Sequence, residues 1–117
     1  MNQKILITGG AGFIGSHLSK CYLEKGCEVY CIDDLSTGSL ENISELQHNP
    51  EYKDRYHLSV DTVFNEELMT QLVGTCDMII HLAAAVGVKY IIDNPLSSIT
   101  TNINGTEITL KLANKFR

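Results

Sequence analysis

Two patterns of hydrophobic residues alternate along the chain, one typical of buried strands and one typical of helices. Short apolar-rich runs, which are typical of strands, occupy residues 4–8, 28–33, 57–60 and 78–82. Apolar residues at helical spacing predict helices over residues 13–25, near 41–47, and after Asn65 through Leu68, Met69, Leu72 and Val73. Gly26 is expected to end the first helix, and Asn65 to cap the third.

A long helix is predicted at the end of the chain. Asn94-Pro95 is typical of a helix start. We expect its buried side to consist of Ile99, Ile103, Ile108, Leu112 and Phe116. The resulting alternation of strands and helices predicts an α/β fold with a parallel sheet and right-handed crossovers.

The composition fits one globular domain and limits the classes of molecule that it could bind. Of the 117 residues, 44% are hydrophobic and 20% charged, and the net charge is −5. This balance argues against nucleic acid or an anionic membrane surface as a partner, because proteins that bind them gather Lys and Arg. No apolar run approaches the roughly 20 residues of a membrane span. An anionic ligand would have to be held by backbone dipoles and a few local groups.

The N-terminus and the cysteines indicate a cytoplasmic protein. Residues 1–15 contain an apolar run, but Thr8, the early glycines and the lack of a cleavage site argue against a signal peptide. The four cysteines form no C-x-x-C pair. We therefore expect reduced core thiols rather than disulfides, and no metal site.

Residues 7–16 (ITGGAGFIGS), at the junction of the first strand and the first helix, hold four glycines, three of which form a spaced motif. Gly9, Gly12 and Gly15 have the spacing G-x-x-G-x-x-G. The first permits a tight turn, the second lets the main chain approach a phosphate, and the third lets helix and strand pack closely. N–H groups at the helix start would then hold a diphosphate. A ligand-free turn and a P-loop are the alternatives, and Ser16-His17 in place of Lys-Ser or Lys-Thr disfavours the P-loop.

Asp33 is the second feature, after the glycine-rich loop, that is expected of a dinucleotide-binding site. It ends the second strand, 18 residues after Gly15 and close to the roughly 20 expected for the acid that accepts the adenosine ribose hydroxyls. A 2′-phosphate about 4 Å away would cost about 4 kcal/mol per charge pair at an effective dielectric near 20. The glycines and the acid together predict a site for NAD rather than NADP, with a solvated strand-end acid as the alternative.

Four segments resemble one family in that family's own order. They are residues 8–15 (TGGAGFIG), 33–38 (DDLSTG), 81–85 (HLAAA) and 102–106 (NINGT). These are similar to the glycine motif, post-strand loop, H-x-A-A stretch and N-x-x-G-T element of extended short-chain dehydrogenases/reductases, the NAD-dependent epimerase/dehydratase family. The resemblance spans nearly the whole chain. It implies the first part, about four strands, of a Rossmann-type doubly wound parallel sheet with NAD as cofactor.

The resemblance also implies which residues contact ligands. Cofactor-binding positions would be Gly9, Gly12, Phe13, Ile14 and Gly15 at the diphosphate, Asp33, Asp34, Ser36, Thr37 and Gly38 at the adenosine ribose, Asp61 and Thr62 at the adenine, Leu82, Ala83 and Ala84 beneath the cofactor, and Asn102 beside them. Val86 and Lys89 stand where relatives begin to contact a nucleotide sugar. Small-residue packing for Ala83–Ala85, a helix-surface amide for Asn102 and a solvated lysine for Lys89 are the alternatives. His81 is expected to be an oriented structural histidine rather than a base.

No catalytic residue is predicted within the chain. The family's chemistry needs a Tyr-x-x-x-Lys pair, in which the lysine and the cofactor charge lower the tyrosine pKa. None of the five tyrosines has a lysine four residues later. We therefore expect residues 1–117 to be a partial NAD-binding Rossmann domain, the N-terminal portion of a longer enzyme whose nicotinamide-side strands and substrate domain are absent.

Two classes of function follow from these observations. The first is the NAD-binding part of an enzyme that oxidises and re-reduces C4 of a nucleotide sugar. By the resemblance, this enzyme is UDP-glucose 4-epimerase-like or, alternatively, a UDP-glucuronate decarboxylase or dTDP-glucose 4,6-dehydratase. The second is a non-catalytic NAD-binding module. An unpaired sheet edge after the fourth strand also predicts self-association.

Overall fold

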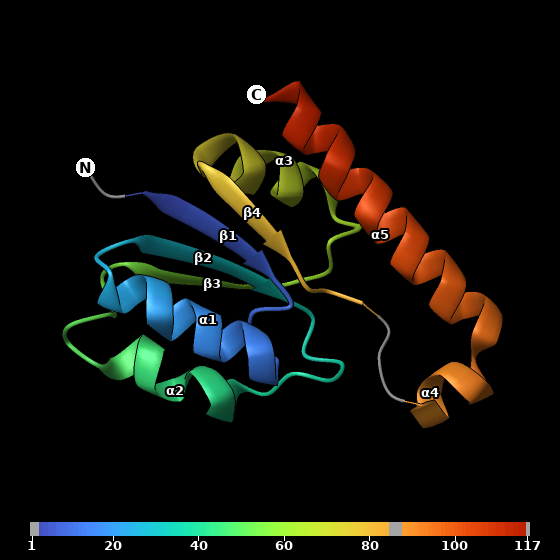
Figure 1. Ribbon diagram of the computed structural model, residues 1–117, viewed down its shortest axis with the longest axis horizontal. Coiled ribbons are helices and arrows are strands. Elements are labelled where there is room, and N and C mark those ends of the chain that lie inside the picture. Colours follow the sequence, from blue (N-terminus) through green and yellow to red (C-terminus); the bar gives the residue numbers. More distant parts are fainter. Residues whose placement is uncertain (1–2, 85–87, 117) are drawn as a thin grey trace.

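Four parallel strands form a single sheet at the centre of the molecule. The computed structural model describes residues 3–84 and 88–116. The strands are β1 (Lys4–Thr8), β2 (Glu28–Asp33), β3 (Tyr56–Val60) and β4 (Met78–His81), in the spatial order β3-β2-β1-β4 (Figure 1). Because Ile7 pairs with both Cys31 and Ile80, the carboxyl ends of the strands meet at one edge. The strand order reverses at β1, between β2 and β4, which is where open α/β sheets bind ligands.

Helices cover both faces of this sheet. The first face carries α1 (Phe13–Glu24) and α2 (Leu40–His48), and the second carries α3 (Glu66–Thr75) and α5 (Pro95–Lys115), with the short α4 (Val88–Asp93) before α5 (Figure 1). Ile5 and Ile7 point into the α1–α2 core, whereas Leu6 points into the α3–α5 core. All three side chains are fully buried. This explains why the first strand is apolar at successive positions.

The predicted α/β architecture is confirmed, and the boundaries of the predicted elements agree to within about two residues, whereas α4 was not predicted. The first helix ends before Gly26, whose φ of 89° is left-handed. The side chain of Asn65 caps α3 by accepting a hydrogen bond from Leu68 N at 3.2 Å. Leu82 was expected in the fourth strand but lies just beyond it.

The predicted buried side of α5 is wrong in part. Leu112 is buried and Ile108 partly buried, but Ile99 and Ile103 are 57% and 61% exposed, and Phe116 is 44% exposed. Ser98, Gly105 and Thr109 face inward instead. A Cβ on Gly105 would already touch Val63 Cγ2, at 3.4 Å, so α5 runs too close to the residues after β3 for a large side chain at this point.

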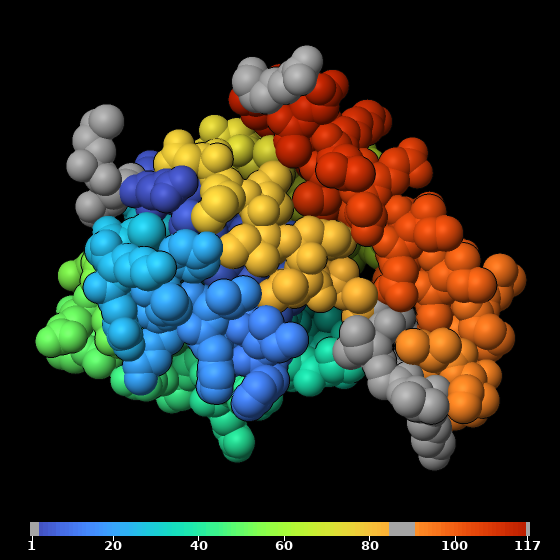
Figure 2. Space-filling model, viewed as in Figure 1, coloured from blue at the N-terminus to red at the C-terminus, as the bar shows by residue number. Residues whose placement is uncertain are grey.

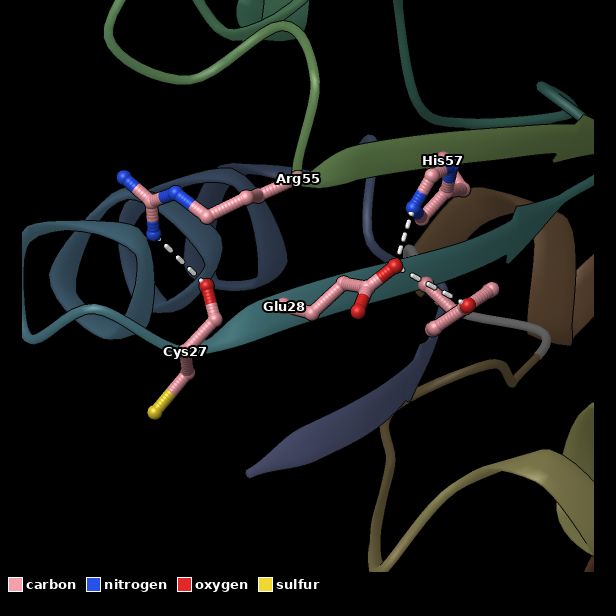
Figure 3. A network of polar contacts seen from close by, with 5 residues as sticks. Cys27, Glu28, Arg55 and His57 are labelled. Carbon is pink, nitrogen blue, oxygen red and sulfur yellow. Dashed lines mark hydrogen bonds and ion pairs between the residues drawn. The ribbon is translucent and has the colours of Figure 1, made fainter. Parts of the chain in front are cut away.

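Polar contacts join the opposite, amino-terminal edge of the sheet (Figure 3). Arg55 Nη1 donates to the carbonyl oxygens of Leu23 and Cys27 at 2.9 and 2.8 Å, which fixes the end of α1. Glu28 Oε1 accepts from His57 Nε2 at 2.6 Å and from the Tyr30 hydroxyl at 3.1 Å. Burial, the largest single influence, would raise the pKa of Glu28, but these two hydrogen bonds and the charges of His57 and Lys4 together outweigh it and hold the pKa below its ordinary value.

In the part of the chain that the structure describes, no helix combines the length and apolar character needed to cross a membrane.

Candidate functional site

A cavity of about 630 Å³ opens at the carboxyl edge of the sheet. It lies between the glycine-rich loop with the start of α1, the ends of β2 and β3, the residues after β4, and α5. In Figure 2 the yellow and light-orange atoms of β4 and the residues after it lie between the blue α1 and the orange-red α5. The predicted residues that line the cavity are Gly9, Gly12, Phe13, Ile14, Gly15, Asp33, Asp34, Ser36, Thr37, Asp61, Thr62, Leu82, Ala83 and Ala84.

Of the four remaining predicted residues, two are placed differently and the side chains of the other two are not described. Gly38 packs against Ala11 rather than lining the cavity, and Asn102 is half-buried on α5 beside Thr101, which does line it. Val86 lies outside the described residues, and for Lys89 only the backbone, in α4, is described. The ligand contacts assigned to all these positions remain predictions.

Sequence reasoning missed other lining residues. Ile32, Val63, Phe64 and Thr101 also line the cavity. Val63 and Phe64 directly follow the predicted Asp61-Thr62 pair, so their position after the third strand was the available signal. Ile32 precedes Asp33 in the same way.

The glycine-rich loop is shaped by close backbone contacts. Gly9 has a φ of 71°, and a Cβ there would lie 2.9 Å from Ala83 N. A Cβ on Gly15 would lie 2.5 Å from the carbonyl oxygen of Gly9. The loop therefore brings the start of α1 to the cavity. The N–H groups of Phe13, Ile14 and Gly15 come before the first helical bond, from Ser16 N to the Gly12 carbonyl oxygen, and so have no acceptor within the helix.

The Asp33 carboxylate accepts hydrogen bonds from backbone N–H groups of two loops that border the cavity. It is 8% exposed, and its Oδ2 accepts from Ala11 N at 2.9 Å while Oδ1 accepts from Leu35 N at 2.8 Å. The carboxylate thus links the glycine-rich loop to the loop after β2. Each oxygen keeps a further lone pair for a ligand hydroxyl.

Ala11 is fixed through both of its backbone polar groups. Its N–H donates to Asp33, and its carbonyl oxygen accepts from Ser39 N at 3.1 Å and from Asn42 Nδ2 at 2.8 Å. Asn42, on α2, was missed by the sequence analysis. Nothing in its sequence neighbourhood indicates that its amide reaches a carbonyl 31 positions earlier.

Asp61 is oriented in a similar way after β3. Its Oδ2 accepts from Asn65 Nδ2 at 2.9 Å, and its Oδ1 accepts from Thr62 N at 2.7 Å. The bonds from Asn65 and Thr62 lower the pKa of Asp61. The carboxylate is therefore ionised and fixed in orientation at this end of the cavity.

The end of β4 is bound to the end of β1 through Thr8. This residue is fully buried, and its Oγ1 accepts from Leu82 N at 3.0 Å and from Ala83 N at 3.1 Å. His81 Nδ1 lies 2.7 Å from the same oxygen. Burial lowers the pKa of His81. The ring is thus engaged with the sheet, in agreement with the expected structural histidine.

The charges of the cavity limit how it could hold a phosphate. Asp33, Asp34 and Asp61 line it, and none of the described lining residues is lysine or arginine. Backbone N–H groups at the start of α1 are then the donors available to an anion, as helix N-termini commonly are. The described residues contain no group of three or more His, Cys, Asp or Glu side chains placed to hold a metal ion.

Comparison with known proteins shows that this chain is similar to enzymes named for nucleotide sugars. The family model described as GDP-mannose 4,6 dehydratase matches residues 6–117. The UDP-N-acetyl-alpha-D-glucosaminuronate decarboxylase of Bacillus cytotoxicus is 35% identical over 115 residues, which are 98% of this chain and 34% of that protein. The chain thus spans about a third of the length of this relative.

Solved structures show the same similarity. The UDP-glucose 4-epimerase of Thermotoga maritima, crystallised with UDP-glucose, superposes with a TM-score of 0.82 and 31% identity over 97% of this chain and 35% of its own. The UDP-glucose 4-epimerase of Thermus thermophilus, in complex with NAD, gives a TM-score of 0.80 and 28% identity over 97% of this chain and 34% of its own.

Proposed function

The chain belongs to the GDP-mannose 4,6 dehydratase family, among the NAD-dependent epimerases and dehydratases, and we propose that it binds NAD in the cavity at the carboxyl edge of its sheet. The observation that carries the proposal is the convergence of the glycine-rich loop and the fixed carboxylate of Asp33 on one cavity. The NAD complex of the Thermus thermophilus relative supports it.

The residues present fit this cofactor. The start of α1 offers N–H groups to a diphosphate. The backbone around Gly9 and Gly15 is too crowded for a side chain at either position, so only glycine allows this shape of the loop. Asp33 offers two carboxylate oxygens to ribose hydroxyls. Phe13 and Ile14 line the cavity and are 74% and 63% exposed, so they present apolar surface to a bound ring. When bound, NAD would supply hydride transfer chemistry.

We propose that the site prefers NAD to NADP. Asp33 and Asp34 lie side by side at the cavity, and no described lining residue offers a positive charge to a 2′-phosphate. The repulsion between a phosphate and a carboxylate about 4 Å away is about 4 kcal/mol per charge pair at an effective dielectric of 20. Ribose hydroxyls carry no such cost.

The proposed reaction is oxidation and re-reduction at C4 of a nucleotide sugar by the whole protein, in the manner of UDP-glucose 4-epimerase. The epimerase crystallised with UDP-glucose supports a uridine nucleotide sugar as partner, and the Bacillus cytotoxicus relative makes decarboxylation the alternative. Incubation of the whole protein with NAD and UDP-glucose, UDP-glucuronate or dTDP-glucose, followed by chromatography of the products, separates these activities. NAD binding by the whole protein without turnover of any sugar would support the non-catalytic module instead.

We also propose that the protein works in the reducing cytoplasm. Cys21, Cys27, Cys31 and Cys76 are all free thiols. Thiols persist in that compartment, whereas secreted domains of this size commonly form disulfides.

Binding of NAD is tested by titrating the isotope-labelled chain and following its backbone amides by NMR. We expect weak binding, with the largest shifts at Gly12–Gly15, Asp33 and Ala83, and small shifts near Asp54, which is exposed in the loop before β3. Absence of shifts at the cavity amides at millimolar NAD would contradict the proposal. Equal or stronger shifts with NADP would contradict the preference for NAD.

A further inference from the structure

The Thr8 hydroxyl lies at the junction between the glycine-rich loop and the residues after β4. Its oxygen is within hydrogen-bond distance of three nitrogen atoms: Leu82 N, Ala83 N and His81 Nδ1. The hydroxyl is buried, so no bulk water competes for it. All three contacts join residues more than 70 positions apart in the sequence.

Hydrogen-bond counting assigns a direction to each contact. A hydroxyl offers one proton and two acceptor lone pairs. The Leu82 and Ala83 amides can only donate, so neither can accept the hydroxyl proton. Of the three nitrogen atoms only His81 Nδ1 can accept it, and to do so it has to be unprotonated. The imidazole is then the neutral tautomer with its proton on Nε2.

The two amides differ in how much they depend on Thr8. Leu82 N also donates to the carbonyl oxygen of Thr8 at 3.0 Å, whereas Ala83 N donates to the hydroxyl oxygen at 3.1 Å. The Ala83 amide also packs against Gly9, where even a Cβ would come within 2.9 Å of it. A shift of Ala83 would therefore disturb both a lining residue of the cavity and the turn that begins the glycine-rich loop.

We propose that Thr8 and His81 are positioning residues of the cofactor site, and that they hold the Ala83 backbone in place only while His81 is the neutral Nε2–H tautomer. This inference rests on the proposed binding of NAD. Protonation of Nδ1 would turn the ring from an acceptor into a third donor and leave the buried hydroxyl proton without an acceptor. The Thr8 side chain would then have to turn away, which would remove the acceptor of the Ala83 amide, whereas Leu82 N would keep the Thr8 carbonyl oxygen.

The surroundings of the ring favour the neutral form. β1 contributes the uncharged Thr8, and α5 contributes Gly105, where a Cβ would lie 3.9 Å from His81 Cε1. Among the described residues, no charged side chain on either element shifts the pKa of His81, which burial alone lowers. The ring is thus fully in the neutral form above the ordinary histidine pKa, and this form is lost as the pH falls through the lower pKa of His81 in the folded protein.

The test measures the NAD dissociation constant between pH 5.5 and 8 for the wild type, His81→Asn and Thr8→Ser. Wild-type affinity should be constant near neutrality and fall below the folded pKa by up to about tenfold per pH unit, the limit for one linked proton. His81→Asn can still accept from Thr8 through its amide oxygen but cannot be protonated, so its affinity should stay flat. Thr8→Ser keeps the hydroxyl and should follow the wild type.

Controls separate this inference from the proposed function. His48→Asn, on the surface of α2, should keep the wild-type profile. A wild-type protein that binds no NAD at pH 8 would overturn the proposed function, whereas NAD binding with identical profiles for wild type and His81→Asn would overturn the positioning role. The ring nitrogens of the NAD-free protein give an independent measurement. Their NMR shifts should show Nε2 protonated at pH 7.5, and a proton on Nδ1 would refute the assignment.

Discussion

Replacing Asp33 with asparagine tests the proposed cofactor preference most directly. The asparagine side chain has nearly the same shape, but it carries no charge and only one acceptor oxygen. In the structure both Asp33 oxygens accept backbone N–H groups, one from buried Ala11 and one from Leu35. We expect the amide oxygen to keep the bond from Ala11 and its NH₂ group to face Leu35 N. Because the Leu35 bond is only part-buried, the loss should lower the free energy of unfolding by about 1–2 kcal/mol.

The effect of Asp33→Asn on ligand preference should be larger than its effect on stability. Removing the carboxylate removes a repulsion of about 4 kcal/mol per charge pair with a 2′-phosphate 4 Å away. The ratio of NADP to NAD affinity should therefore rise by up to about a thousandfold, since 1.4 kcal/mol corresponds to about tenfold. NAD itself should bind somewhat more weakly, because charge-assisted bonds to its ribose become neutral ones.

Calorimetric titration of both dinucleotides at fixed salt measures this ratio. Asp54→Asn is the matched control: it makes the same change of charge at an exposed position far from the cavity, and it should leave the ratio unchanged. An Asp33→Asn protein that folds and still prefers NAD by the wild-type factor would refute the argument. So would an equal change of the ratio in both variants, because it would trace the preference to net charge.

Four further outcomes are expected. Gly15→Ala should destabilise the protein by at least about 1–3 kcal/mol, because its Cβ would lie 2.5 Å from a carbonyl oxygen; a wild-type urea midpoint would contradict this. Asn42→Asp should lower both the unfolding free energy, by about 1–2 kcal/mol, and NAD affinity, because a carboxylate oxygen would face the Ala11 carbonyl. Its effect should appear in urea melts and in titration, and the absence of both changes would show that the contact is dispensable. Since the folded pKa of Glu28 is depressed, its contribution to stability is present above about pH 4.5 and is lost as the pH falls through the folded value; Glu28→Gln, which keeps a partner for His57, should flatten this part of the pH–stability curve. Finally, β4 has no strand on its outer side among the described residues, so the chain should self-associate with rising concentration in sedimentation runs, and a monomer throughout would argue against an adhesive edge.

Much of the site could be anticipated because it follows from strand order and backbone shape. The glycine spacing, an acid at the end of the second strand and small residues after the fourth each mark a strand's carboxyl end. In a parallel sheet these ends meet at one edge, so local signals far apart in the sequence become neighbours. The prediction succeeded where a residue type is required by a local conformation, as at Gly9.

The partners of the side chains that hold this edge together could not be anticipated in the same way. Asn42, Asn65 and His81 are ordinary polar residues whose partners lie 31, 4 and 73 positions away. Their roles depend on rotamers and on which backbone group remains without a partner after the strands have paired. A single sequence gives the donors and acceptors but not these distances.

The buried face of α5 was predicted wrongly for a physical reason that can be seen in the spacing of its small residues. The helix does bury one stripe, at Ser98, Gly105, Thr109 and Leu112, and these positions have the spacing of one helical face. Three of the four are small, because the helix backbone lies close to Val63 and to the His81 ring. A search for large apolar residues therefore selected Ile99 and Ile103, which lie on another face. On this helix the size of a side chain, rather than its hydrophobicity, indicates which face meets the sheet, and Gly105→Leu should disrupt this packing more than Ile103→Ala.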